Sequence, residues 1–368
     1  MRASDRSWLL TLTHLPSISG HEDRVVAFVR DWVARRDDLR VKADRHGNLW
    51  LTQVRRSRRA PLYVTAHMDH PGFLVTSVDG RDAKVEFRGG VKPGYFDDAS
   101  LHFFAPGSDE PVGARLTSYD PSTREGTVHV RRGAVEEGWI GRWAFPARSL
   151  GVKGDLLHAP GCDDLAGVAA ALSFLDRVRR KDGMGHVGVV LTRAEEVGLV
   201  GAIAASRSGA IHDDARLICL ETSRSFAESP VGGGPVVRVG DRLTVFDADL
   251  TNRVSEVAER HGKAFPWQRK LMAGGVCEAS VFAAYGYGST CICLPLGNYH
   301  NMGNLDEVEQ GTGEATPKPE VISLSDHDGL IRLLLLVAQH LDDPGADVRS
   351  RLEDRFDDSV LERRLGQR

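Results

Sequence analysis

The sequence predicts an α/β fold: a mixed sheet covered by helices on both faces, with a small all-β domain inserted into it. Short apolar strands alternate with amphipathic helices towards both ends of the chain. Between about residues 73 and 148 this alternation stops, and only short strand-like pieces occur. Alternating helices and apolar strands are typical of a parallel or mixed sheet that is buried on both faces.

The elements of the larger domain follow from the spacing of apolar residues. Helices are predicted at Trp8–Leu12, Arg24–Arg36, Leu165–Val178, after Glu196, and at Asp328–Leu341. Strands are predicted at Asn48–Val54, Leu62–Thr65, His186–Thr192, Leu217–Leu220 and Cys291–Leu294. Ser325, three residues before Asp328, is expected to cap the last of these helices.

The inserted domain is predicted from closely spaced strand pieces that Gly, Pro and Asp separate. These pieces are Lys84–Phe87, Leu101–Phe104, Ala114–Ser118, Thr127–Arg131 and Arg142–Phe145. We therefore expect a discontinuous domain of residues 1–72 and 149–345 and an inserted domain of residues 73–148. A charged tail of residues 346–368 follows, and the chain from Asp342 onward is predicted to form a solvated helix.

Composition excludes several classes of protein. The chain has 47 basic and 51 acidic residues, so no strong field of one sign favours nucleic acid or an anionic membrane. No apolar run is long enough to span a bilayer. Five cysteines without a CxxC pair indicate reduced thiols and a cytoplasmic protein. Cys291 and Cys293 are expected to be buried, inert thiols on opposite sides of a strand.

Side chains of metal-ligand type follow several of the predicted strands, and an acidic pair precedes one helix. In open α/β sheets, ligands collect outside the carboxyl ends of the strands, so we expect these side chains to meet at one edge. They are His67, Asp69, Asp163, Asp164, Glu195, Glu196, Glu221 and His300. Taken singly, such residues are more often loop or capping residues; the ordered combination predicts a site.

Two imidazoles and several carboxylates suit divalent ions such as zinc, cobalt or manganese. One carboxylate is able to bridge two ions roughly 3.5–4 Å apart, with a hydrolytic water between them. Neighbouring side chains on an extended segment point different ways, so Glu195 and Glu196 supply a ligand and a free base. Asp69, two residues after His67, is placed to orient that imidazole. His70 is expected to have a substrate-side or structural role.

Four motifs together resemble the dinuclear-metal exopeptidase clan: Ala66-His67-Met68-Asp69, Asp163-Asp164-Leu165-Ala166-Gly167, Glu195-Glu196-Val197-Gly198-Leu199-Val200-Gly201-Ala202 and Tyr299-His300. The chain looks most like the tetrahedral, dodecameric aminopeptidases, a family that includes glutamyl and deblocking aminopeptidases. The resemblance extends from about Thr11 to Leu341 and includes the position of the inserted domain.

The resemblance implies two divalent ions, foremost zinc, with cobalt or manganese as alternatives. Asp163 would bridge them, Glu196 and His300 would complete one site, and His67 and Glu221 would complete the other. Glu195 would be the general base that activates a bridging water, and Asp69 would support His67. The inserted domain would serve dimerisation or limit access, and the chain would form a homo-oligomer.

The implied reaction is removal of N-terminal residues from peptides. A carboxypeptidase, or an amidohydrolase acting on N-acyl amino acids, stays open, because the ligand set alone does not separate these reactions. A non-catalytic binding protein is less consistent with the presence of all five ligands and Glu195.

Three positions depart from the family pattern. Glu221 stands where the family usually has Asp, and His70 where it usually has Glu. The usual Gly-Gly-Thr-Asp reads Gly274-Gly275-Val276-Cys277. These changes leave the ligands in place, and they bear on substrate preference and assembly.

Overall fold

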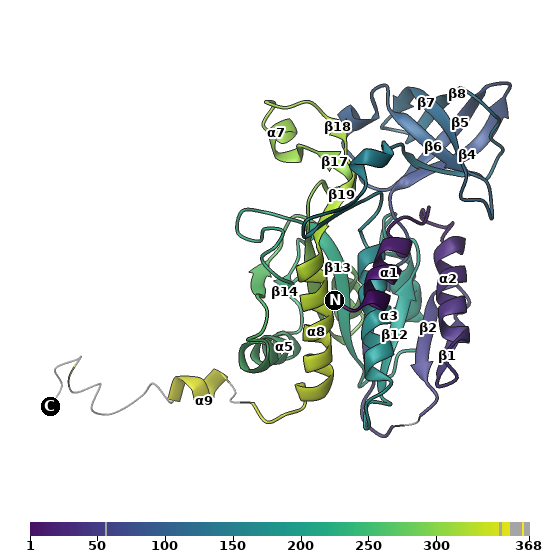
Figure 1. Cartoon of the computed structure of the whole chain (residues 1–368). Helices are drawn as coiled ribbons and strands as arrows, with labels where there is room; N and C mark the ends of the chain where they lie inside the picture. The colour runs from purple at the N-terminus through teal and green to yellow at the C-terminus, as the bar shows by residue number, and fades with distance from the viewer. Residues whose placement is uncertain (56, 346–347, 354–362, 364–368) are drawn as a thin grey trace.

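The computed structural model describes residues 1–55, 57–345, 348–353 and 363. An α/β domain occupies the lower part of Figure 1 and a β-barrel the upper part. The predicted fold class, a mixed sheet between helices with an inserted all-β unit, is confirmed.

The α/β domain is built on an eight-stranded mixed sheet. Its four central strands run parallel, and antiparallel neighbours flank them on both sides. The carboxyl ends of the central strands therefore share one edge, which the barrel faces. In spatial order the strands are β1 (Leu39–Ala43), β2 (Leu49–Gln53), β12 (Val187–Thr192), β3 (Leu62–His67), β13 (Arg216–Arg224), β16 (Gly288–Leu296), β14 (Val236–Gly240) and β15 (Gln268–Leu271).

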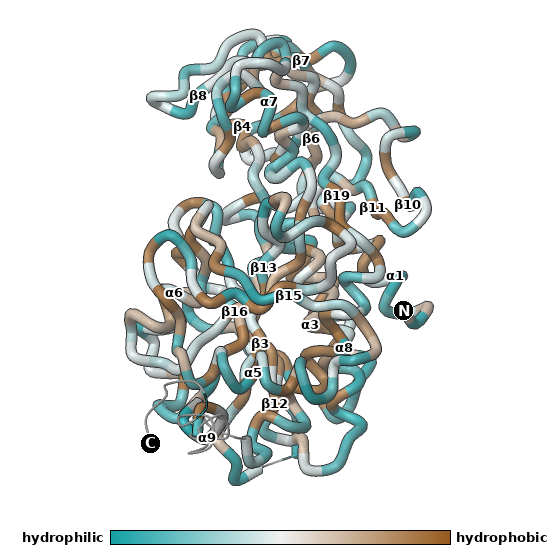
Figure 2. The backbone as a smooth tube through the Cα atoms, turned by 90° about the vertical axis from the view of Figure 1, so that its left-hand side faces the viewer, coloured by the Kyte–Doolittle hydropathy of each residue, from teal (hydrophilic) through white to brown (hydrophobic). Residues whose placement is uncertain are grey.

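Helices cover both faces of this sheet, because alternate strand residues are apolar on both sides. One face carries α1 (Ala3–Leu12), α2 (Asp23–Ala34), α3 (Leu165–Val178), α5 (Ala248–His261) and α8 (Leu324–His340). The other carries α4 (Val200–Arg207) and α6 (Glu278–Ala284). In β13, Ile218 packs towards the first group and Leu217 towards the second. Figure 2 shows hydrophobic segments along the central strands β3 and β16.

The cysteines are buried free thiols, as predicted, but the prediction that Cys291 and Cys293 face opposite sides is wrong. Residues two apart on a strand point the same way. Both therefore pack with Cys219 and Cys277 in the core beneath α4 and α6, and Ile292 between them faces the other side.

The inserted unit is a closed antiparallel barrel in which every strand has two neighbours. Closure removes the exposed sheet edges that a small β-sheet would otherwise present. Phe73, Phe87, Phe96, Phe103 and Trp143 fill its core. Around the barrel the strands are β4 (Gly72–Asp79), β5 (Asp82–Arg88), β8 (Glu125–Val130), β7 (Pro111–Asp120), β6 (Ser100–Phe104) and β9 (Ile140–Trp143).

Short elements connect the two domains close to the shared strand edge. They are β10 (Gly151–Lys153), β11 (Leu156–Ala159) and β19 (Glu320–Ser323) in one small sheet, and β17 (Met302–Gly303) with β18 (Thr316–Pro317) in another. The 3-10 turns η1 (Pro93–Phe96), η2 (Ala147–Ser149) and η3 (Tyr299–Asn301) and the helix α7 (Leu305–Glu309) complete this region.

The structure differs from two sequence-based expectations at the C-terminal end. α8 begins before the predicted residue, and Ser323, not Ser325, caps it: the Ser323 hydroxyl accepts a hydrogen bond from Asp326 N at 3.0 Å. The chain leaves β19 at Ser323, so the turn into the helix falls there. In the tail, residues 342–345 form a turn and an irregular stretch, so the prediction of a helix from Asp342 onward is wrong there. α9 (Val348–Glu353) is helical, and the remainder of the predicted tail helix, apart from Arg363, lies outside the described residues.

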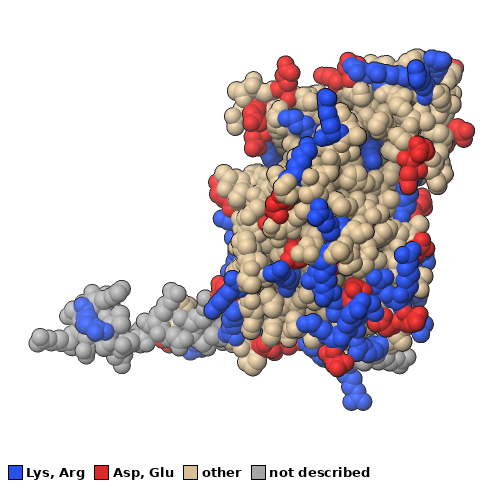
Figure 3. All heavy atoms as spheres, in the orientation of Figure 1, with Lys and Arg blue, Asp and Glu red and all other residues tan. Residues whose placement is uncertain are grey.

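Acidic and basic side chains are intermixed over both domains on the face that Figure 3 presents. Within the described ranges, no helix combines the length and apolar character needed to cross a bilayer.

Candidate metal centre

Asp163 lies between two imidazoles at the shared strand edge. Its Oδ1 is 3.3 Å from Nε2 of His67, and its Oδ2 is 3.3 Å from Nε2 of His300. Glu221 Oε1 lies 3.9 Å from the His67 nitrogen, and Glu196 Oε1 lies 3.1 Å from the His300 nitrogen. The five side chains form two groups of three with Asp163 in common, each compact enough to hold one ion.

These side chains come from five separate segments. His67 is the last residue of β3, and Asp163 stands just before α3. Glu196 lies in the turn after β12, and His300 lies in η3 with a left-handed φ of 51°. Glu221 lies inside β13, which runs four residues further than the predicted Leu217–Leu220. The strand ends thus gather the predicted residues, as the parallel arrangement requires.

Each imidazole is oriented through its other ring nitrogen. Nδ1 of His67 is 3.1 Å from the backbone oxygen of Asp69 and 3.4 Å from its Oδ1. Nδ1 of His300 is 2.6 Å from the backbone oxygen of Gly90, which belongs to the barrel domain. Donation from Nδ1 leaves Nε2 of both rings as a free acceptor directed at Asp163. The backbone of Asp69 is thus a closer partner for His67 than the predicted carboxylate.

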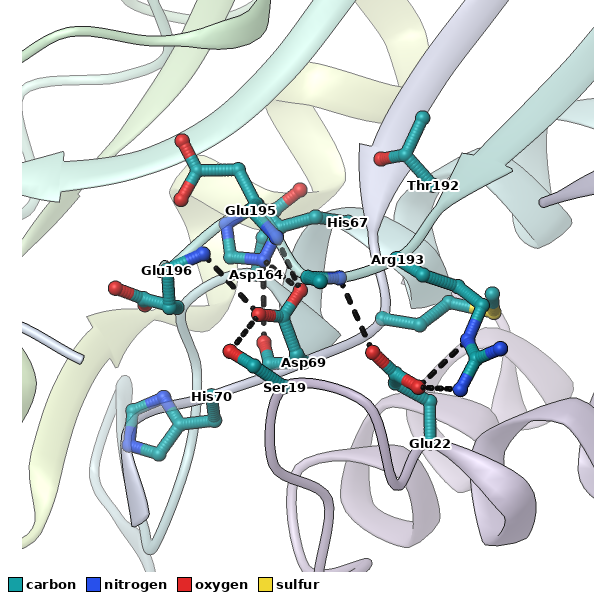
Figure 4. A network of polar contacts seen from close by, with 12 residues as sticks. Ser19, Glu22, His67, Asp69, His70, Asp164, Thr192, Arg193, Glu195 and Glu196 are labelled. Carbon is teal, nitrogen blue, oxygen red and sulfur yellow. Dashed lines mark hydrogen bonds and ion pairs between the residues drawn. The ribbon is translucent and has the colours of Figure 1, made fainter. Parts of the chain in front are cut away.

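The Asp69 carboxylate also holds the acidic pair. It accepts hydrogen bonds from Glu195 N at 3.0 Å and Glu196 N at 3.1 Å, and from Ser19 Oγ at 2.6 Å (Figure 4). In Figure 4 the Glu195 and Glu196 side chains extend in different directions from this turn. One buried carboxylate therefore links the loop of His67 to the loop of the acidic pair.

Glu320 of β19 holds the other two ligand segments together. Its carboxylate accepts hydrogen bonds from Cys162 N at 2.5 Å, Asp163 N at 3.0 Å and His300 N at 2.8 Å. Burial raises its pKa, and the nearby histidines oppose that effect. Sequence reasoning missed this residue, because a single Glu at the start of a short strand carries no distinguishing local pattern.

The structure gives His70 and Gly167 supporting roles beside the acidic pair Asp163 and Asp164. His70 Nδ1 lies 2.6 Å from the backbone oxygen of Asp163, and its Nε2 lies 3.2 Å from Asn301 Oδ1. His70 thus supports the Asp163 segment and belongs to neither ligand group. A side chain at Gly167 would collide with the carboxylate of Asp164, which accepts a hydrogen bond from Thr222 Oγ1 at 2.8 Å.

The electrostatics of the site reflect many carboxylates in a small buried volume. Burial raises the pKa of Glu221 to about 7, and Asp163 adds to this shift. Burial also raises the pKa of Glu195 well above its ordinary value; His67 opposes the shift, and Glu221 and Glu196 add to it. The pKa of Asp163 is lowered, because the imidazoles of His300 and His67 that face its two oxygens outweigh the effect of its burial. The same contacts raise the pKa values of His67 and His300 despite their burial.

The donor set fits divalent cations. Asp163 Oδ1 and Glu196 Oε1 are buried and accept no hydrogen bond from the described part of the chain. An unsatisfied buried carboxylate oxygen is costly, and a cation bound there would remove that cost. Imidazole nitrogens and carboxylate oxygens are the ligands that zinc, manganese and cobalt share in proteins.

A cavity of about 460 Å³ opens beside this centre. Glu221, a member of one candidate ligand group, and Tyr299, whose ring stacks on His300, line it, and residues 90–93 of the barrel domain form part of its wall. Arg238 also lines it, although only 3% of this residue is exposed. The apolar residues of the lining are Val91, Phe226, Met272, Val276, Met302 and Leu305.

Comparison with known proteins shows that the chain is similar to peptidases. Residues 139–311 match the M42 glutamyl aminopeptidase family model. A curated protein of Acetivibrio thermocellus named "Putative aminopeptidase" is 24% identical over 318 residues, which cover 80% of this chain and 91% of the relative.

Solved structures share the fold. Aminopeptidase APDkam598 of Desulfurococcus kamchatkensis has a TM-score of 0.74 at 19% identity, covering 94% of this chain and 98% of that chain. The TET1 peptidase of Pyrococcus horikoshii, which can assemble into a tetrahedron or a large octahedral shell, has a TM-score of 0.72 at 20% identity. That match covers 91% of this chain and 99% of the TET1 chain.

Proposed function

The chain is a metal-dependent peptidase related to the M42 glutamyl aminopeptidases, and we propose that it removes N-terminal residues from peptides with two divalent ions held at one centre. The observation that carries the proposal is the position of Asp163. Its two oxygens face two imidazoles, each of which has its own additional carboxylate.

His67 and Glu221 would hold one ion and His300 and Glu196 the other, with Asp163 shared between them. Zinc is the first choice, and cobalt or manganese would suit the same ligands. When bound, such ions polarise the scissile carbonyl and lower the pKa of water to near neutrality. The chain itself supplies ligand orientation through Asp69 and Gly90 and shields the centre from bulk solvent.

Glu195 is the proposed general base. Its carboxylate lies within the ligand cluster of His67 and Glu196, yet the other five residues already account for both ion sites. Its raised pKa suits a group that takes a proton from the attacking water and then passes it to the leaving amine. Burial, which raises that pKa, also strengthens the field that the centre exerts on the substrate.

The cavity next to Glu221 and Tyr299 is the proposed site for the side chain of the N-terminal residue. It combines apolar walls with a few charged groups, as small-molecule sites generally do. The barrel domain is proposed to limit access, because its residues 90–93 line this cavity and Gly90 contacts His300. Assembly into a homo-oligomer is proposed from the assemblies of its relatives. The cytoplasmic location stays a prediction.

Carboxypeptidase and N-acyl-amino-acid amidohydrolase activities are the alternatives. The named aminopeptidases among the relatives favour the first reading. A non-catalytic binding protein would have no use for a base beside a complete ligand set.

The test combines metal removal with paired substrates. A chelator should abolish cleavage of an unblocked peptide, and zinc, cobalt or manganese should restore it, with metal content followed by elemental analysis. The same peptide with an acetylated N-terminus should not be cleaved, because the free amine is part of what an aminopeptidase binds. Full activity after verified metal loss, release of the acetyl group, or trimming from the carboxyl end would each contradict the proposal.

A further inference from the structure

The turn that carries Glu195 leaves β12 at Thr192 and includes an unfavourable backbone conformation. Ala194 has a φ of 51°, in the left-handed region that residues with a side chain rarely adopt. Such a conformation is unfavourable and persists only where surrounding contacts determine it. The position of Glu195 therefore depends on what holds this turn.

Side-chain oxygens from three other segments hold four consecutive backbone N–H groups of the turn. Arg193 N donates to Asn48 Oδ1 at 3.1 Å, and Ala194 N donates to Glu22 Oε1 at 3.1 Å. The N–H groups of Glu195 and Glu196 both donate to Asp69. The residue with the left-handed backbone is thus the one that Glu22 holds.

Glu22 is fully buried at the start of α2, and each of its oxygens has defined partners. Oε1 also accepts from Gly20 N at 2.8 Å, and Oε2 accepts from the Arg193 guanidinium at 2.7 Å from Nε and 2.6 Å from Nη2 (Figure 4). A buried carboxylate is costly unless it is paired and hydrogen-bonded. These contacts offset that cost, and they join the turn to the N-terminal segment.

We propose that Glu22 is a positioning residue for catalysis: by holding Arg193 and Ala194 it fixes the turn that aims the Glu195 carboxylate at the reacting water. This inference rests on the proposed function, in which Glu195 is the base. Glu22 itself belongs to none of the ligand groups found among the described residues. Its effect on turnover therefore passes through the geometry of Glu195.

The test compares Glu22→Gln with Asp326→Asn as a matched control. Asp326 is also buried and also accepts two loop N–H groups, from Gly232 at 2.7 Å and Gly234 at 2.8 Å. Its loop carries none of the proposed ligands and no proposed base. Both variants lose one buried charge that holds a loop, so a general loss of stability should affect them alike.

The measurements are kcat, KM, bound metal per chain and thermal midpoint for the metal-loaded enzyme. Glu22→Gln should lower kcat roughly ten- to hundred-fold, because misplacement of a catalytic group by about 1 Å costs on the order of a hundred-fold. Its KM and metal content should stay close to those of the unmodified protein. Asp326→Asn should lower the thermal midpoint while leaving kcat within about two-fold.

A double variant separates positioning from a direct role. Glu22→Gln combined with Glu195→Gln should be no slower than Glu195→Gln alone, because a misplaced base that is already absent costs nothing further. If Glu22→Gln does not fold, Glu22→Asp replaces it in the test, because it keeps the charge. The shorter side chain should no longer reach Ala194 N, so this variant should also have a lower kcat.

Three results would overturn the inference: kcat unchanged in a folded Glu22 variant, losses that multiply in the double variant, or a loss explained by missing metal. Failure of this inference differs from failure of the proposed function, because in the second case Glu195→Gln would keep its activity.

Discussion

Glu195 and Glu196 are adjacent in sequence, and the turn between β12 and α4 directs their side chains to different places. Glu196 reaches Nε2 of His300, with 5% of its side chain exposed. The two N–H groups are both held by Asp69, so the directions of the two side chains are set by the backbone of the turn. A difference in surroundings lets neighbouring carboxylates take different roles, in keeping with the proposed base and ligand.

Exchange of each acid for its amide should separate these two roles. Glu195→Gln keeps nearly the same shape and removes the proton acceptor, so it should bind both metals and lose roughly a hundred- to ten-thousand-fold in kcat. Glu196→Gln should weaken one metal, and its activity should partly recover with excess divalent ion. Metal content and kcat measured on both variants distinguish the two roles. If Glu195→Gln lost metal while Glu196→Gln kept it, Glu195 would be the ligand and Glu196 the base.

Asp69→Asn should be more damaging than the loss of an imidazole partner alone. The amide replaces one accepting oxygen with a donor, which then faces Ser19 Oγ or one of the N–H groups of Glu195 and Glu196. Activity and metal affinity should fall roughly ten- to hundred-fold, in keeping with losses of outer partners at metal sites. Isothermal titration with zinc and steady-state kinetics measure both effects, and a wild-type rate would exclude a role for Asp69.

At the scale of elements, the packing of α8 on α3 buries an ionisable side chain. His327 of α8 is fully buried, and its Nε2 lies 3.2 Å from the backbone oxygen of Ala166 in α3. Burial lowers its pKa from 6.5 to about 4. The folded protein therefore holds this imidazole neutral at pH values where the unfolded chain would protonate it.

Stability should decrease as the pH falls from about 6.5 through about 4, because the unfolded chain then binds the proton first. By pH 5, the protonation of His327 in the unfolded chain should lower the free energy of unfolding by about 2 kcal/mol. His327→Gln keeps a donor for Ala166 without a titration in this range, so its stability should depend less on pH. Urea unfolding of both proteins at about pH 7 and about pH 5, with chelator present throughout, tests this prediction. An equal loss of unfolding free energy between the two pH values in both proteins would contradict it.

The cavity beside the metal centre is formed where β13, β14 and the barrel loop meet, and its charged groups differ in their pairing. Lys92 and Arg224 both pair with Glu309, the former at 2.9 Å. Among the described residues, the hydrogen-bond acceptors of Arg238 are neutral: Ser223 Oγ at 3.0 Å and the backbone oxygen of Met272 at 3.3 Å. Its Nε has no hydrogen-bond partner within the part of the chain that the structure describes.

Peptides with an acidic N-terminal residue should therefore be preferred, because a carboxylate entering the cavity would pair with a guanidinium that is already desolvated. Arg238→Met should lower kcat/KM for an N-terminal Glu substrate roughly ten- to hundred-fold and change the value for N-terminal Leu little. Matched Glu, Gln and Leu substrates measure the preference. Equal rates for Glu and Gln in the unmodified enzyme would contradict it.

At the scale of the whole molecule, the barrel and the α/β domain complete one site between them. The backbone oxygen of Gly90 orients His300, and residues 90–93 line the cavity, so the position of this proposed ligand and the access to the cavity depend on how the two domains meet. Arg88 of the barrel also donates to the backbone oxygen of Ser19 at 2.8 Å, next to the segment that holds Glu22. An assembly that fixes the barrel would therefore also influence the centre.

The chain should behave as a homo-oligomer in solution. Light scattering coupled to size-exclusion chromatography should give a mass that is a multiple of the 40.2 kDa chain. The same run after metal removal shows whether assembly depends on the ions. A monomer at micromolar concentration, with metals bound, would contradict the proposed assembly.

The sequence by itself determined the α/β class, the interruption near residue 73 and the residues that meet at the strand edge. Local patterns are sufficient for these features, because apolar periodicity reports which faces are buried and parallel strands bring their carboxyl ends together. The candidate ligands could be singled out for the same reason, since each lies at or near the end of a recognisable strand or shortly before a helix.

Only the tertiary structure decided which groups support that centre. Glu22, Glu320 and Gly90 act across more than 100 residues of chain, on Arg193, Asp163 and His300 respectively, as hydrogen bonds between segments. Such contacts leave no periodic trace in the sequence, because a single buried acid or a backbone oxygen looks the same wherever it lies. Closure of the barrel and the cavity beside Arg238 likewise follow from how distant strands pair, which local apolar patterns do not encode.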